Sequence, residues 1–200
     1  MKLYNDTYSE KVGCTSGYAG FRNRRRLKIF TTIIPVTKDD DVLEIGPNTC
    51  LLLDAFKTKA KSIVGIELNE AAVKQANRAD LLCMDATNMN FADSVFTTVI
   101  AIEVLEHIPT LQKAFSEIAR VLKPGGKCYI SVPFEFFRGQ QALGDAWHNF
   151  RDLRMARKLH VHKLNPAKIK KMSAHTGLQI VESKLIWIPG PSYLIVLQKK

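Results

Sequence analysis

The segment from Val42 to Cys50 constrains the fold of this chain more than any other. It reads Val-Leu-Glu-Ile-Gly-Pro-Asn-Thr-Cys, an apolar strand that leads into a turn containing glycine. A second apolar strand, Ser62 to Ile66, is followed directly by a carboxylate, Glu67. In doubly wound α/β sheets, a strand, a glycine turn and an acid at the end of the next strand bind the ribose of a nucleoside. We therefore expect a parallel sheet with a nucleoside site beside Glu67.

Apolar segments of strand length alternate with helical periods over the first two thirds of the chain. The clearest helical period begins at Leu111, runs to Leu122 and stops at the Pro-Gly-Gly of residues 124–126. Strands that alternate with helices predict a mainly parallel sheet between two layers of helices. The expected strands are 41–45, 62–66, 79–84, 97–102 and 127–132, and the expected helices are 21–34, 49–57, 70–77 and 111–122.

The pattern changes after Pro133. Residues 134–161 are aromatic, basic and irregular, with a helical segment expected over 152–159. Asn165 is suited to cap a helix that has proline at its first position, and Gly177 is suited to close it. A short Pro-Gly-Pro connection then predicts an antiparallel pair of strands. These last two strands are expected at 178–188 and 192–199.

The composition is that of one soluble globular domain. A chain of 200 residues with 46% apolar residues is large enough for a sizeable core. Its formal charge of +10 favours anionic partners. No apolar run reaches the roughly 18 residues of a membrane span, and Met1 to Glu10 lacks the apolar core of a signal peptide, so we expect a cytoplasmic protein. The cysteines form no Cys-x-x-Cys pair, which favours reduced thiols over disulfides or zinc.

Five segments occur in the order and with the spacing of one known family: Val42–Gly46, Gly65–Leu68, Cys83–Ala86, Phe96–Ile108 and Leu122–Gly126. They resemble, in turn, the first motif, the ribose-binding motif, the adenine-contacting turn, the fourth motif and the post-helix motif of the class I S-adenosylmethionine-dependent methyltransferases. The likeness is greatest to the small UbiE/UbiG-like group (methyltransferase type 11). It implies a Rossmann-like, three-layer doubly wound α/β fold, with a mainly parallel seven-stranded sheet closed by an antiparallel C-terminal strand.

The resemblance also implies that residues 1–200 form one domain with three functional segments. Residues 1–35 form an N-terminal arm and helix, residues 36–132 form the cofactor-binding half, and residues 133–200 form the acceptor-side insert and the closing strands. The implied cofactor is S-adenosylmethionine. The residues that the resemblance assigns to it are Glu44, Gly46, Asn48, Cys50, Glu67, Leu68, Asp85, Ala86 and Ile102.

Each polar group of this cofactor has a residue in the sequence that suits it. Glu67 suits the ribose diol and Asp85 suits the adenine amine, with the backbone N–H of Ala86 facing a ring nitrogen. The turn after Gly46 and the following helix N-terminus suit the carboxylate, and Glu44 suits the ammonium. One departure stands out, because the family pattern acid-x-Gly-x-Gly-x-Gly has asparagine and cysteine at its second and third glycines here. Asparagine tolerates a positive φ, whereas the cysteine side chain crowds the turn.

Methyl transfer from a sulfonium needs alignment of the acceptor and exclusion of water more than a catalytic group. An acceptor that must lose a proton also needs a base, and the candidate catalytic residues are His107, His148 and His160. His160 and His162 form a conceivable metal pair, but no third ligand is evident, so we expect no metal. Phe134, Phe136, Phe137 and Trp147 are candidates to line an apolar acceptor pocket, although ordinary packing of the insert is favoured. Arg151, Arg154 and Lys158 share a basic helical face, for which exposure to solvent is the favoured role.

The sequence thus predicts methyl transfer to a small-molecule or lipid-like acceptor, with the anionic character that the basic charge favours. The attacked atom (O, N or C), the base and the oligomeric state stay open. Nucleic acid is a less favoured partner: the charge would suit an RNA methyltransferase, but no added RNA-binding module is present. A non-catalytic S-adenosylmethionine-binding regulatory protein is a second alternative, suggested by the altered glycine motif. A nicotinamide dehydrogenase is disfavoured because G-x-G-x-x-G is absent.

Overall fold

The computed structural model describes residues 17–187 and 190–200, with the side chains of residues 17–22, 145, 148 and 149 outside the description. Its centre is a seven-stranded sheet with the order β3-β2-β1-β4-β5-β7-β6. The first five strands pair in parallel, and β7 lies antiparallel between β5 and β6. The predicted α/β fold is therefore confirmed. The strands are β1 (Asp41–Ile45), β2 (Ser62–Glu67), β3 (Leu81–Cys83), β4 (Phe96–Ile102), β5 (Leu122–Pro133), β6 (Leu178–Trp187) and β7 (Pro191–Lys199).

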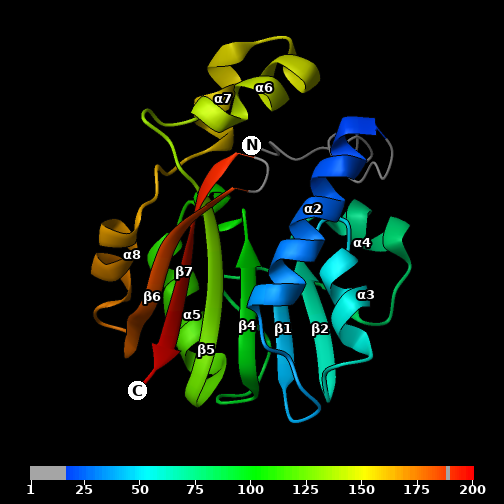
Figure 1. Ribbon diagram of the computed structural model, residues 1–200, viewed down its shortest axis with the longest axis vertical. Helices are drawn as coiled ribbons and strands as arrows, with labels where there is room; N and C mark the ends of the chain where they lie inside the picture. The colour runs from blue at the N-terminus through cyan, green and yellow to red at the C-terminus, as the bar shows by residue number, and fades with distance from the viewer. Residues whose placement is uncertain (1–16, 188–189) are drawn as a thin grey trace.

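Helices lie on both faces of the sheet. Figure 1 shows α2 and α3 in front of the parallel strands, with α5 behind them and α6 and α7 beyond their carboxyl ends. Three short 3₁₀ helices, η1 (Leu105–His107), η2 (Gln140–Ala142) and η3 (Leu153–Met155), join these elements. The helices are α2 (Gly17–Ile33), α3 (Leu51–Lys57), α4 (Glu70–Ala76), α5 (Leu111–Val121), α6 (Leu143–Phe150), α7 (Ala156–Leu159) and α8 (Pro166–Ser173).

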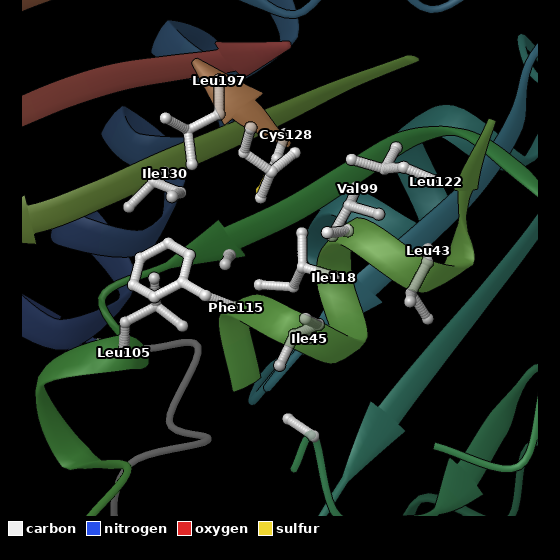
Figure 2. Close-up of a cluster of buried hydrophobic side chains, with 14 of the residues drawn as sticks. Leu43, Ile45, Val99, Leu105, Phe115, Ile118, Leu122, Cys128, Ile130 and Leu197 are labelled. Atoms are coloured by element: carbon white, nitrogen blue, oxygen red, sulfur yellow. The ribbon is translucent and has the colours of Figure 1, made fainter. Parts of the chain in front are cut away.

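Two hydrophobic layers hold the sheet between its helices. Neighbouring residues of β4 illustrate this, because Val99 packs in the cluster beneath α5 and Ile100 packs in the cluster beneath α2 and α3. Figure 2 shows the first cluster, where Phe115 and Ile118 of α5 point towards strand residues that include Val99 and Ile130. A strand buried on both faces reads as a continuous apolar run, as the sequence of β4 does. These layers fix the carboxyl ends of the parallel strands, where the site lies.

Several expected boundaries differ from the structure: α2 begins at Gly17 instead of residue 21, and β5 begins at Leu122 instead of residue 127. The helix from Leu111 ends at Val121 instead of continuing to the Pro-Gly-Gly, because Leu122 is already extended and pairs with Phe96 as the first residue of β5. The residue before a proline avoids the helical region, so the chain leaves the helix before Pro124 is reached. The strand expected over 79–84 is shortened to Leu81–Cys83.

The insert after β5 contains more helix than expected. A helix, α6, occupies Leu143–Phe150, and the single helical segment expected over 152–159 is divided between η3 and α7. The apolar positions Leu143, Ala146 and Phe150 have the helical spacing that would have revealed α6, and all three belong to one cluster with residues of α7. The capping prediction is confirmed, since the side chain of Asn165 accepts a hydrogen bond from the Lys168 N–H at 2.8 Å.

Candidate functional site

A cavity of about 690 Å³ opens at the carboxyl ends of the parallel strands. Ligands of doubly wound sheets bind at this edge. The structure brings together the whole set of cofactor-binding residues predicted from the sequence, and all of them line this cavity: Glu44, Gly46, Asn48, Cys50, Glu67, Leu68, Asp85, Ala86 and Ile102. His107 and His160 line it as well, whereas the side chain of His148 lies outside the described residues.

The turn after β1 keeps its shape without the two further glycines. Gly46 has φ +65°, and its N–H donates to the Ile66 carbonyl at 2.8 Å. Asn48 and Cys50 also have left-handed backbones, with φ of 41° and 56°. The sequence therefore predicted the conformation of Asn48 correctly, while Cys50 holds a conformation that costs a residue with a Cβ about 1–2 kcal/mol.

Two carboxylates face the cavity from the ends of β2 and β3. Glu67 Oε1 accepts a hydrogen bond from the Asn69 N–H at 2.9 Å, and Asp85 Oδ1 accepts one from the Thr87 N–H at 2.7 Å. These bonds use backbone groups that follow each acid and so fix its side chain. Burial raises the pKa of Glu67, an effect that the backbone N–H groups of Asn69 and Leu68 oppose.

Glu44 is a buried acid with an unsatisfied oxygen. Only 4% of its surface is exposed, and Oε2 has no hydrogen-bond partner. Burial raises the pKa of Glu44 to about 8, although the Leu53 N–H and the charge of Arg78 oppose the shift. A buried carboxyl oxygen without a donor is costly and calls for a partner. An ammonium group in the cavity would supply one, so the residues present fit the cofactor.

Two histidines that lie far apart in the sequence also line the cavity. His107 belongs to η1 and His160 follows α7, and their ring centroids are 5.0 Å apart. Burial, and then the neighbouring His160, lowers the pKa of His107 to about 4. His162 is not the partner of His160: its Nε2 lies 3.1 Å from the Ile108 carbonyl. Instead, His160 meets Glu106 and His107 in a group whose potential ligand atoms all lie within 4.8 Å of one another.

The aromatic residues of the insert do not line the cavity, so the alternative of an acceptor pocket built from them is not supported. Phe136, Phe137 and Trp147 are 75%, 54% and 52% exposed, and they and Phe134 are absent from the cavity lining. Phe134 packs instead against Tyr193, with ring centroids 5.5 Å apart. The insert covers the cavity with other side chains, and α2 contributes a set that the sequence did not indicate. The lining residues missed from these two segments include Arg26, Leu27, Phe30, Gln141 and Leu159.

The expected basic helical face is also divided. Arg151 ends α6 with a left-handed backbone, and its guanidinium lies over the Trp147 ring at 5.6 Å. Arg154, in η3, forms an ion pair with Asp152 at 2.9 Å. Lys158 belongs to the separate helix α7. The three cations therefore share no helix, because the chain turns between each pair of them.

Among the described residues, none of the helices has the length and hydrophobicity that crossing a bilayer requires. In the same part of the chain, the three described cysteines, Cys50, Cys83 and Cys128, are free thiols. Cys14 lies outside the described residues.

Residues 43–130 match the family model described as a methyltransferase domain. Over 169 residues the chain is 24% identical to ubiquinone biosynthesis O-methyltransferase of Coxiella burnetii, which is 80% of this chain and 72% of that protein. It is 36% identical to 24-methylenesterol C-methyltransferase 2 of Oryza sativa subsp. japonica over 35% of this chain and 22% of that protein. It is 30% identical to the biotin biosynthesis bifunctional protein BioHC of Cellvibrio japonicus over 46% of this chain and 19% of that protein. The chain therefore spans only about a fifth of the length of the last two relatives.

Solved structures share the fold. A methyltransferase in complex with the Trm112 activator of Haloferax volcanii superposes with a TM-score of 0.73 at 18% identity, over 97% of this chain and 98% of that chain. A methyltransferase of Bacillus halodurans superposes with a TM-score of 0.67 at 18% identity, over 86% and 98%. The strand order, the glycine turn and the acids that line the cavity agree with these matches. Residues 43–130 of this chain match a methyltransferase domain, and the described chain shares the fold of methyltransferases.

Proposed function

We propose that this chain transfers a methyl group from S-adenosylmethionine to a small-molecule or lipid-like acceptor. The observation that carries the proposal is the continuity of the cavity, in which the acids suited to the cofactor and the histidines suited to an acceptor share one space. The relatives named for ubiquinone and sterol methylation support an acceptor of this class. The basic charge of the chain would favour acceptors with anionic character.

The cofactor supplies a methyl group already activated by its sulfonium, so the protein contributes position and environment. Glu67 would hold the ribose diol, Asp85 the adenine amine and Glu44 the ammonium. The Gly46 turn lets the backbone approach the cofactor closely. Leu159 and His160 would cover the acceptor end and exclude water. His107 and His160 are the proposed catalytic residues there, and His148 stays a prediction.

The first experiment is calorimetric titration of the full chain with S-adenosylmethionine and, separately, with S-adenosylhomocysteine. We expect micromolar dissociation constants, about 8 kcal/mol of binding free energy. Turnover to S-adenosylhomocysteine with small and lipid-like acceptors then separates an enzyme from a regulatory protein, and salt-dependent RNA retention would favour the nucleic-acid alternative. If the folded chain binds neither compound, the proposed function is wrong.

Cofactor affinity is expected to rise with pH through Glu44. At about pH 6 this carboxyl is protonated in the free chain, since its pKa lies near 8. The cofactor ammonium stabilises the carboxylate, so binding lowers that pKa and releases a proton. Affinity should therefore increase from about pH 6 towards pH 8, by up to about tenfold per pH unit.

The measurement is calorimetric titration with S-adenosylhomocysteine across this pH range, for the natural chain and for Glu44→Gln. Glutamine has the shape of the protonated acid and cannot ionise, so the variant should bind weakly and lose this rise. A natural chain whose affinity is flat or falls as the pH increases would contradict the assignment of Glu44 to the ammonium.

A further inference from the structure

The acceptor end of the cavity contains a buried carboxyl group with one oxygen that lacks a hydrogen-bond partner. Glu106 is 1% exposed, and its Oε2 has no hydrogen-bond donor. His107 and His160 lie beside it, and one potential ligand atom from each of the three side chains lies within 4.8 Å of the others. Burying a carboxylate oxygen without a donor is unfavourable unless a ligand completes the site. The natural partner for a carboxylate flanked by two imidazoles is a cation.

Both histidines are held in the orientation that suits a metal ligand. The Nδ1 of His107 lies 2.7 Å from the Leu159 carbonyl oxygen, which only accepts hydrogen bonds, so Nδ1 carries the proton. The Nδ1 of His160 lies 2.9 Å from Glu135 Oε1 and donates in the same way. With Nδ1 of each ring turned to its acceptor, Nε2 is the atom that can bind a metal, and in His107 this atom is 3.9 Å from Glu106 Oε1. Metal-binding histidines are oriented by such carbonyl and carboxylate partners.

The charges around the group also call for a cation. Glu103 accepts a hydrogen bond from Ser131 Oγ at 2.6 Å and lies 3.6 Å from Arg26. Glu103, Glu106 and Glu135 place three carboxyl groups here, beside the guanidinium of Arg26. When all three carboxyl groups are ionised, these four side chains carry two negative units, which a divalent cation would balance.

We propose that Glu106, His107 and His160 bind a divalent transition-metal cation at the acceptor end of the cavity. Two imidazole nitrogens and one carboxylate oxygen suit zinc, manganese or iron, whereas magnesium and calcium prefer oxygen ligands. Ligands of one such ion at about 2.1 Å lie at most about 4.2 Å apart. The side chains must therefore approach each other by roughly half an ångström on binding, a movement that the Glu106 side chain can supply.

This site deepens the proposed function, on which the following step rests, by favouring a hydroxyl acceptor. Three protein ligands leave a coordination position open, and the same residues line the cavity. A hydroxyl oxygen bound there would have a lowered pKa and would release its proton to solvent. The oxygen would form the new bond to the methyl carbon as the carbon–sulfur bond breaks and its electron pair returns to sulfur. The products are a methyl ether, S-adenosylhomocysteine and one proton.

The test uses the full chain without a histidine tag, stripped of metal with a chelator. Titration with Co²⁺ alone, followed by its visible absorption, should show binding of one equivalent, which Zn²⁺ then displaces. Glu106→Gln keeps the size of the side chain, and His160→Ala removes one imidazole. Each should weaken binding at least about tenfold. His175→Ala, which removes an exposed histidine outside the cavity, should bind Co²⁺ as the natural chain does.

Failure of the natural chain to bind Co²⁺ or Zn²⁺ would overturn the metal site, as would unchanged binding in both ligand variants. Titration of the same samples with S-adenosylhomocysteine tests the proposed function independently. Cofactor binding without metal binding refutes the metal site alone. Metal binding without cofactor binding supports the site and refutes the methyl transfer. Circular dichroism of each variant confirms that the chain is folded.

Discussion

Gly46→Ala is expected to destabilise the fold by about 2–5 kcal/mol and to abolish cofactor binding. Two costs add up at this position. A left-handed backbone, here φ +65°, costs a residue with a Cβ about 1–2 kcal/mol. The new Cβ would also lie 2.6 Å from Val104 Cγ2 and 3.2 Å from Val104 Cβ, and such overpacking typically costs about 1–3 kcal/mol. Urea unfolding measures the first effect and titration with S-adenosylhomocysteine the second.

Gly125→Ala is the matched control. Gly125 has φ +78°, close to that of Gly46, but a Cβ added there would meet no atom within 4 Å. This variant therefore reports the backbone cost alone, about 1–2 kcal/mol. Adding Val104→Ala to Gly46→Ala should recover part of the stability that Gly46→Ala loses in excess of Gly125→Ala. Equal destabilisation of Gly46→Ala and Gly125→Ala would show that contact with Val104 plays no part.

The elements with local signals were predictable from the sequence. The apolar run of β4, the period that begins at Leu111 and the cap at Asn165 each depend on neighbours within one or two turns. The acids Glu67 and Asp85 were also predictable, because the ends of parallel strands meet at one edge of the sheet. Glu44, Glu67 and Asp85 line one cavity for that reason.

The acceptor end was less predictable, because tertiary packing assembles it. His107 and His160 belong to segments separated by β5 and the insert, so no local pattern shows that their rings meet. From spacing alone, the sequence offers only a conceivable pairing of His160 with His162, which is not favoured. The conformation of Cys50 escaped prediction for a different reason: intrinsic preference opposes a left-handed cysteine, and the fold imposes it.

Glu67→Ala is expected to weaken binding of S-adenosylhomocysteine by at least about 100-fold. The carboxylate would accept charge-assisted hydrogen bonds from both ribose hydroxyls, and each such bond contributes about 1.5–3 kcal/mol. Glu67→Gln should have a smaller effect, since its carbonyl still accepts from the Asn69 N–H and from one hydroxyl. A ribose contact is indicated if the natural chain binds most tightly, Glu67→Gln less tightly and Glu67→Ala most weakly.

Glu70→Ala separates this effect from a general change in charge at the start of α4. Glu70 lies three residues further along the chain, pairs with Lys74 at 2.7 Å and is absent from the cavity lining. Its loss should cost no more than about 0.5 kcal/mol of stability and leave the affinity unchanged. If Glu67→Ala binds S-adenosylhomocysteine as tightly as the natural chain does, then Glu67 does not contact the cofactor. The ribose would then have to be held by other groups that line the cavity, such as the carboxylate of Asp85.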